Sequence, residues 1–291
     1  MDEITLKALA KINLGLDVVR RREDGYHEVR MIMQTIHLYD LLEIQKIREP
    51  GIQIVSNLSF LPVNENNLVY KAARLLQEEF ALTDGISVKL TKRIPVAAGM
   101  AGGSTDAAAM LYAMNQLYDL GLSRMELMKR GVQIGADVPY CLMRGTALAE
   151  GIGEKLTQLP PMIKCPVLIA KPSISVSTRF VYQNLKLDEQ TNHPDIDALM
   201  KDIREKDFDG VCAHMGNVLE SVTIPNYPVI AEIKQQMMRS GAKASMMSGS
   251  GPTVFGLFED GETAKRALRE MKRSGLAKQV YLTTIYNNRR K

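Results

Sequence analysis

A glycine-rich stretch from Pro95 to Asp106 holds the residues best suited to chemistry in this sequence. Gly99, Gly102 and Gly103 allow backbone conformations that other residues avoid, so amide groups can come close to an oxyanion. The stretch runs into an alanine-rich segment, 103–117, which is apolar nearly all round and predicts a buried helix. The unpaired N–H groups and the positive dipole at a helix start favour phosphate. This pattern predicts a phosphate-binding loop.

The order of residues in the sequence excludes several other types of loop. The chain has no Gly-x4-Gly-Lys-Ser/Thr P-loop, and this stretch has no Gly-x-Gly-x-x-Gly dinucleotide fingerprint. Neither Ser104 nor Ser250 is flanked as a hydrolase nucleophile would be. Glycines before a helix also form ordinary turns, and the loop alone leaves that alternative open.

Length and composition describe an ordinary globular protein of two domains. The chain has 291 residues, of which 45% are hydrophobic and 24% are charged. A net charge of +4 suits an anionic ligand, but it is too small and too dispersed to indicate nucleic-acid binding. The basic run Arg289 to Lys291 is interpreted as a solvated chain end.

The cysteines and the apolar segments indicate a reduced, cytoplasmic protein. Cys141, Cys165 and Cys212 are odd in number and far apart, and neither CxxC nor HxxxH spacing occurs, so we expect thiols rather than a zinc site. The N-terminus starts acidic and does not look like a signal peptide. No apolar run approaches the roughly 18–20 residues that a membrane span needs.

Hydrophobic periodicity predicts an α+β protein in which strands and helices alternate. Ser123 and Glu126 form a capping-box pattern at the start of one helix, which Gly135 would end. In the first region the predicted strands are 4–16, 38–47, 52–55 and 86–92, and the predicted helices are 67–80, 103–117 and 123–135. A second region, from about residue 160, has strands 166–170, 254–258 and 279–285, a helix over 228–239, a helix around 264–271, and irregular segments at 173–178, 188–197 and 248–253.

Three motifs in order resemble those of the GHMP kinases. The glycine-rich loop resembles the phosphate-binding motif of that family, Ala10 to Leu14 matches its N-terminal strand motif, and Ser248 to Thr253 matches its C-terminal glycine motif. Together they bracket most of the chain. The resemblance implies a two-domain GHMP kinase fold, with a ribosomal-protein-S5-like domain over 1–160 and a ferredoxin-like α/β sandwich over 161–291. It also implies an ATP-dependent small-molecule kinase.

Three further segments are similar to one branch of that family. They are Arg22 to Glu28, Asn67 to Ala73 and Ile134 to Tyr140. Enzymes of this branch phosphorylate a hydroxyl of a cytidyl-linked sugar alcohol in the non-mevalonate route to isoprenoid precursors. The resemblance thus implies that sugar alcohol as substrate and ATP with Mg²⁺ as cofactor. It leaves the metal ligands and the oligomeric state unassigned.

Carried over by position, the resemblance assigns the reacting groups. Asp137 would be the catalytic base and Lys11 its cationic partner, which would also keep the carboxylate ionised. One carboxylate and one cation suffice, because phosphoryl transfer depends mostly on positioning and charge stabilisation. The residues implied for ATP are Pro95, Val96, Ala97, Ala98, Gly99, Met100, Ala101, Gly102, Gly103, Ser104 and Thr105.

The resemblance also assigns the substrate contacts. Asn13 would hydrogen-bond the polyol, while Tyr26 and His27 would hold the cytosine by stacking and by edge hydrogen bonds. Tyr182 stands where the family places a second aromatic over that base. The Tyr26–His27 pair argues against kinases of homoserine, sugars or mevalonate, whose substrates have no aromatic base. An intact Lys11 and Asp137 argue against a non-catalytic binding protein on the same fold.

Each motif has an ordinary structural alternative when taken alone. Lys11 could lie on a solvated strand face, Asp137 could cap a turn, and a Gly-Tyr-His tip is common in hairpins. Only the joint occurrence of the motifs favours the kinase. The phosphate loop also departs from the family pattern, because Ala101 stands where a glycine is usual. We expect its tip to bend differently or to bind ATP less tightly.

Overall fold

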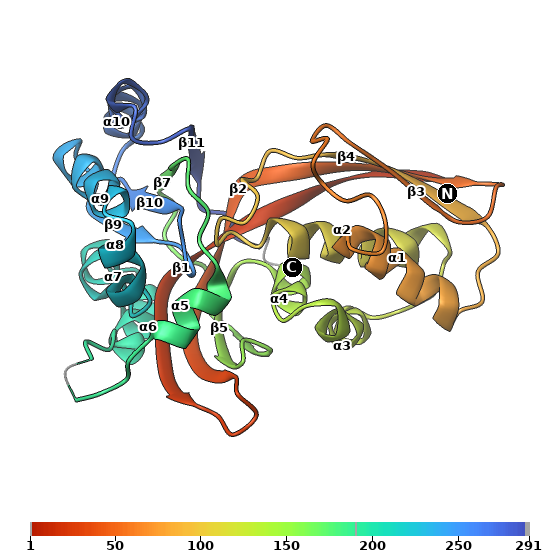
Figure 1. Cartoon of the computed structure of the whole chain (residues 1–291), viewed down its shortest axis with the longest axis horizontal. Coiled ribbons are helices and arrows are strands. Elements are labelled where there is room, and N and C mark those ends of the chain that lie inside the picture. Colours follow the sequence, from red (N-terminus) through yellow and green to blue (C-terminus); the bar gives the residue numbers. More distant parts are fainter. Residues whose placement is uncertain (1, 190, 289–291) are drawn as a thin grey trace. The chain divides into compact units, whose positions relative to one another are not determined.

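The computed structural model describes residues 2–189 and 191–288, which form two compact units that are each discontinuous in sequence (Figure 1). Unit 1 contains residues 2–10, 38–96 and 101–143, and unit 2 contains 11–37, 97–100 and the described residues from 144 onward. The predicted domain boundary at residue 160 divides the chain at a single point, and it stays a prediction. The basic run Arg289 to Lys291 lies outside the described residues.

The α+β class predicted from the sequence is confirmed. Unit 1 and the two strands that it shares with unit 2 contain β1 (Glu3–Arg21), β2 (His27–Ile47), β3 (Ile52–Ser56), α1 (Leu68–Glu79), β4 (Gly85–Thr91), α2 (Gly102–Leu117), α3 (Arg124–Ile134) and α4 (Val138–Met143). Unit 2 adds β5 (Thr146–Gly151), β6 (Lys155–Gln158), β7 (Pro166–Lys171), α5 (Thr178–Asn184), α6 (Ile196–Glu205), α7 (Phe208–His214), β8 (Gly216–Asn217), α8 (Glu220–Asn226), α9 (Val229–Arg239), β9 (Ala244–Met247), β10 (Val254–Leu257), α10 (Gly261–Ser274) and β11 (Gln279–Thr284).

Unit 1 is a sheet with helices packed against it. Its strands lie in the order β3-β4-β2-β1, with β3 parallel to β4 and β4 antiparallel to β2. Helices α1, α2 and α3 lie on one side of these strands in Figure 1. Helix α2 is buried on nearly every face because its alanines let neighbouring helices approach closely, as its composition predicts.

Unit 2 combines the remaining halves of β1 and β2 with a second sheet. Strand β1 pairs in parallel with β8, and β2 pairs antiparallel with β5, which in turn pairs with β6. The second sheet has the order β11-β7-β10-β9, and all its pairings are antiparallel. Helices α9 and α10 pack against this sheet. The loop from β9 to β10 is the C-terminal glycine motif.

Some predicted elements are confirmed and others start elsewhere. The capping box of α3 is present, with Ser123 and Glu126 bonding each other's backbone N–H, and the helix ends at Gly135. The strand predicted over 38–47 begins at His27, because residues 31–36 are buried on both faces and lack the alternation that identifies a strand. Sequence analysis also missed α4, α5, α7 and α8, which are too short to establish a helical period. It missed α6 as well, although the apolar residues Ile196, Leu199, Met200 and Ile203 of this helix do have helical spacing.

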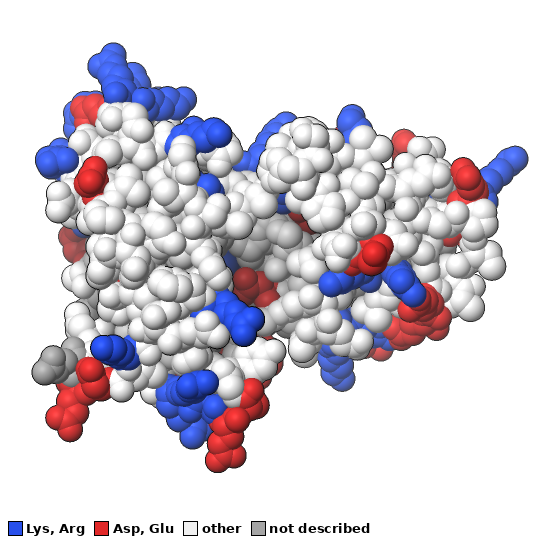
Figure 2. All heavy atoms as spheres, in the orientation of Figure 1, with Lys and Arg blue, Asp and Glu red and all other residues white. Residues whose placement is uncertain are grey.

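No helix within the described residues is long and apolar enough to span a membrane. On the face visible in Figure 2, basic and acidic side chains are interspersed and much of the surface is uncharged. All three cysteines are thiols.

The tip of the glycine-rich loop has an unusual backbone at Ala101, the N-cap of α2. Its φ is 56° and its ψ is 30°, the left-handed conformation that glycine adopts without strain and alanine does not. Its methyl group cannot cap the helix, so α2 begins with no side-chain hydrogen bond to its first amides. Alanine at this position therefore adds backbone strain, and it leaves the first amides of α2 without a side-chain acceptor.

Replacing Ala101 with glycine should raise the free energy of unfolding by roughly 0.5–1 kcal/mol, because relief of the left-handed strain exceeds the entropy that glycine gains in the unfolded chain. Urea unfolding measures this change. Ala98 lies in the same loop but outside the left-handed region. Ala98→Gly should therefore lower stability by about 1 kcal/mol, and a loss of stability in both variants would contradict the strain at Ala101.

Candidate functional site

The N-terminal strand motif places a buried ammonium group within unit 2. Lys11 and Asn13 are two apart on β1 and therefore share a face of the strand. Lys11 Nζ donates to Asn13 Oδ1 at 2.7 Å and to the carbonyl oxygen of Gly99 at 3.0 Å. Because Lys11 is only 5% exposed, the alternative of a solvated strand face is wrong.

The C-terminal glycine motif packs on the phosphate loop at Gly99. Ser248 Oγ donates to the same Gly99 carbonyl oxygen at 2.9 Å. A Cβ atom on Gly99 would lie 2.1 Å from the carbonyl oxygen of Ser248, and φ at Gly99 is 71°. Both the space and the conformation therefore require glycine here. The C-terminal glycine motif is therefore in direct contact with the phosphate loop.

Asn217, which sequence analysis missed, holds the glycine motif in its shape. Its Nδ2 donates to the carbonyl oxygens of Met247 and Gly249, both at 2.8 Å, and its Oδ1 accepts from Leu219 N. It lies on β8, which pairs with β1 near Gly15. A two-residue strand has no period, so no sequence signal could have identified this position.

In unit 1, the start of α2 lies beside the segment that carries Asp137. The first helical hydrogen bond runs from Thr105 N to Ala101 O, so the amides of residues 102–104 have no acceptor within the helix. A Cβ atom on Gly135 would lie 4.0 Å from Ser104 Oγ. Asp137 is half-buried directly before α4, and its carbonyl oxygen accepts from Cys141 N. The backbone two residues before Asp137 is thus close to the helix start.

The predicted site residues are divided between the two units. Residues 97–100 of the loop and Lys11 belong to unit 2, whereas residues 101–105 and Asp137 belong to unit 1. The pairing of Lys11 with Asp137 at a reacting hydroxyl therefore stays a prediction.

Two of the three predicted base-binding rings are in contact. The ring centroids of His27 and Tyr182 are 5.1 Å apart with an interplanar angle of 42°. Burial lowers the pKa of His27, and the charge of Arg21 lowers it further, so the imidazole is neutral near pH 7 and offers one donor and one acceptor. Tyr26 is 62% exposed at the hairpin tip, with its hydroxyphenyl group accessible to a ligand.

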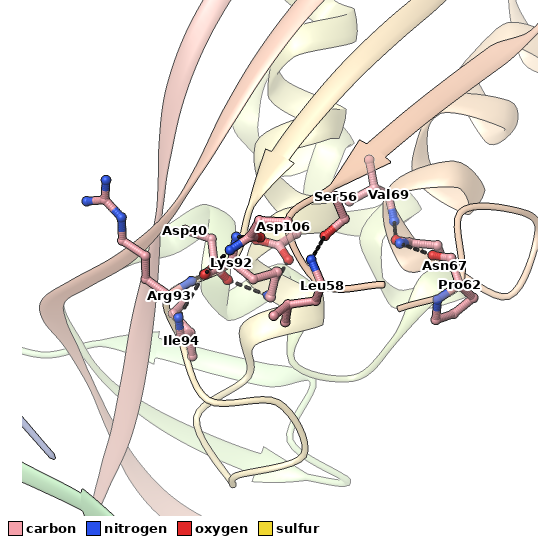
Figure 3. Close-up of polar contacts among 11 residues, drawn as sticks. Asp40, Ser56, Leu58, Pro62, Asn67, Val69, Lys92, Arg93, Ile94 and Asp106 are labelled. Atoms are coloured by element: carbon pink, nitrogen blue, oxygen red, sulfur yellow. Dashed lines mark hydrogen bonds and ion pairs between the residues drawn. The ribbon is translucent and has the colours of Figure 1, made fainter. Parts of the chain in front are cut away.

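A buried ionic cluster lies close to α2 in unit 1 (Figure 3). Lys92 Nζ bonds Asp106 Oδ2 at 2.6 Å and also bonds Asp40 Oδ2. The three side chains are at most 4% exposed. Asp40 Oδ1 also accepts from the backbone N–H groups of Arg93 and Ile94. This cluster joins β2, the segment after β4 and α2.

The donor set for a metal ion is sparse. Within the described ranges, no three histidine, cysteine, aspartate or glutamate residues gather in a way that could hold an ion.

Comparison with protein families matches two regions of the chain. Residues 67–145 match the N-terminal domain of GHMP kinases, and residues 199–277 match the GHMP kinase C-terminal domain. The 4-diphosphocytidyl-2-C-methyl-D-erythritol kinase of Lachnospira eligens is 58% identical over 286 residues, which cover 98% of this chain and 99% of that protein. The enzyme of the same name from Lachnoclostridium phytofermentans is 55% identical and covers 99% of both chains.

Solved structures have the same fold. A crystal structure of 4-(cytidine 5′-diphospho)-2C-methyl-D-erythritol kinase matches with a TM-score of 0.85 and 31% identity, covering 98% of this chain and all of that one. Homoserine kinase from Cytophaga hutchinsonii has a TM-score of 0.80 at 22% identity, covering 98% and 95% of the two chains, which shows the shared fold alone. The chain therefore belongs to the GHMP kinases, which are ATP-dependent phosphotransferases, and within them to the 4-diphosphocytidyl-2-C-methyl-D-erythritol kinase family.

Proposed function

We propose that this protein transfers the γ-phosphoryl group of ATP to the 2-hydroxyl of 4-diphosphocytidyl-2-C-methyl-D-erythritol, a step of the non-mevalonate route to isoprenoid precursors. The observation that carries the proposal is the near-full-length identity to enzymes of that name. The buried Lys11 ammonium supports it, because its two acceptors are neutral oxygens and its positive charge stays available to an anion.

In this mechanism, residues 95–105 bind the ATP phosphates through backbone amides at the start of α2. Asp137 accepts the proton of the attacking hydroxyl, and Lys11 stabilises the charge that develops as the phosphoryl group moves. Asn13 orients the polyol; its contact with Lys11 supports this role. Separate residues thus position the nucleophile and neutralise the charge.

The cytosine is held by Tyr26, His27 and Tyr182. A neutral imidazole suits edge hydrogen bonds to a pyrimidine, and the tilted pair of rings offers an aromatic surface for stacking. This pocket would select the cytidyl substrate over homoserine, sugars and mevalonate.

Magnesium enters as the MgATP complex and is therefore part of the substrate. The sparse donor set supports this role, since Mg²⁺ keeps water and phosphate oxygens as ligands. We place the reaction in the cytoplasm, which supplies ATP and keeps the three thiols reduced.

Purified protein supplied with MgATP and the cytidyl substrate should release ADP, because only this substrate has a base that the three rings can hold. A coupled ADP assay with homoserine, galactose and mevalonate as matched alternatives measures the selectivity. Faster turnover of any of these three than of the cytidyl substrate would contradict the proposal.

Asp137→Asn should lower kcat by about 10²- to 10⁴-fold, the usual contribution of a general base, while ATP still binds. Steady-state kinetics and equilibrium ATP binding separate the two effects. Asp84→Asn, at an exposed carboxylate of the same unit, serves as the control and should retain activity. Full activity of Asp137→Asn would remove the base assignment.

Tyr182→Leu should raise KM for the cytidyl substrate by roughly 5- to 100-fold, because stacking of a base on an aromatic ring contributes about 1–3 kcal/mol. The KM for ATP should not change. Tyr182→Phe keeps the ring and should stay close to the parent enzyme. An equal rise in KM for both variants would show that stacking is not the role of this ring.

A further inference from the structure

The Asp40–Lys92–Asp106 cluster (Figure 3) has no part in the proposed chemistry, although Lys92 reaches the first residue of α2, where we propose that phosphate binds. It combines two carboxylates with one ammonium group, so its net charge is −1 when all three groups are ionised. A net charge is costly to bury unless it is compensated or protonated. The three side chains are nearly inaccessible to solvent, so the energetic cost of burying a net charge applies to this cluster.

The two carboxylates are not equivalent. Asp40 accepts hydrogen bonds from Lys92 Nζ and from the backbone N–H groups of Arg93 and Ile94. Asp106 accepts one, from Lys92 Nζ to its Oδ2. Its Oδ1 is buried and has no hydrogen-bond partner among the described residues. The ionised form is therefore well supported at Asp40 and poorly supported at Asp106.

The electrostatic environment of Asp106 favours its protonated form. Burial raises the pKa of Asp106 well above its usual range; Lys92 opposes the shift, while the charge of Asp40 and a hydrogen bond to it raise the pKa further. The opposing carboxylates in turn leave the pKa of Lys92 raised although burial alone would lower it. Lys92 is thus a fixed cation.

The other elements packed against α2 bring no further charge to Asp106. The buried faces of α1 and α3 consist of apolar residues and one glycine. The buried residues of α4 include two titratable groups, Tyr140 and Cys141, which are neutral in their ordinary states. The charges that act on Asp106 are therefore those of Lys92 and Asp40.

The cluster is close enough to the helix start to respond to an anion there. A Cβ atom on Gly102, the first residue of α2, would lie 3.3 Å from Lys92 Nζ. Asp106 lies four residues further along the helix, about 6 Å along its axis. ATP phosphates at the helix start would have the same sign of charge as an ionised Asp106 and would increase its affinity for a proton.

We propose that ATP binding at the start of α2 is coupled to the uptake of one proton by Asp106, which makes the Asp40–Lys92–Asp106 cluster neutral while the phosphates are bound. The proton comes from solvent, is held by Asp106 in a hydrogen bond to Asp40, and returns to solvent when the nucleotide leaves. The inference rests on the nucleotide site proposed above.

Isothermal titration calorimetry of the whole protein with MgATP, in buffers that differ in ionisation enthalpy, tests the coupling. Measured from about pH 6 to about pH 10, proton uptake should pass through a maximum between the pKa values of Asp106 in the free and bound protein. Asp106→Asn, which has the same shape but does not titrate, should bind ATP without that uptake. Unchanged uptake in Asp106→Asn, or none in the parent protein at any pH, overturns the proposal.

Two further variants make the test independent of that one substitution. Asp40→Asn keeps an acceptor for Arg93 N and Ile94 N but removes a negative charge, so the maximum should move to lower pH; an unmoved maximum overturns the role of the cluster. Asp119→Asn removes an exposed carboxylate just beyond the other end of α2 and should behave as the parent protein. Absence of any ATP binding overturns the nucleotide site as well, whereas binding without buffer dependence overturns this inference alone.

Discussion

The arrangement of the loops in unit 2 depends on hydrogen bonds to one atom, the carbonyl oxygen of Gly99. It accepts hydrogen bonds from the ammonium group of Lys11 and the hydroxyl of Ser248. The approach is possible only because residue 99 has no side chain: a Cβ atom there would collide with the backbone of Ser248. Because Gly99 has no Cβ atom, the first strand and the C-terminal glycine loop can both donate to a single acceptor on the phosphate loop.

The two buried lysines show how their partners determine what such a group can do. Lys92 is held by two aspartate side chains, which cancel its charge, whereas Lys11 is held by two neutral oxygens. A buried cation with neutral acceptors keeps an electrostatic field that an anionic ligand can use. Lys92 therefore stabilises the fold, whereas Lys11 is available for ligand binding.

Much of this organisation could be predicted because it depends on local sequence. The alanine-rich helix, the capping box of Ser123 and the glycine motifs each fit within a few residues, and the family assignment that they supported is confirmed. The ionic cluster could not be predicted. Lys92 and Asp40 are 52 residues apart, and each lies in a segment whose own pattern gives no reason to pair them. Asn217 was missed because its strand has only two residues, and the two carbonyl oxygens that it holds are about 30 residues away.

The sharing of β1 and β2 between the units has a consequence for how the chain is made. Every residue of unit 1 precedes residue 144, so all of unit 1 is synthesised before most of unit 2. Residues 11–37 cannot pair with β5 and β8 until those strands have been synthesised. Apolar strand surface therefore stays uncovered until then. Because each unit is discontinuous in sequence, neither can be produced as one contiguous fragment, and the nascent chain depends on residues after 143 to cover strands made before them.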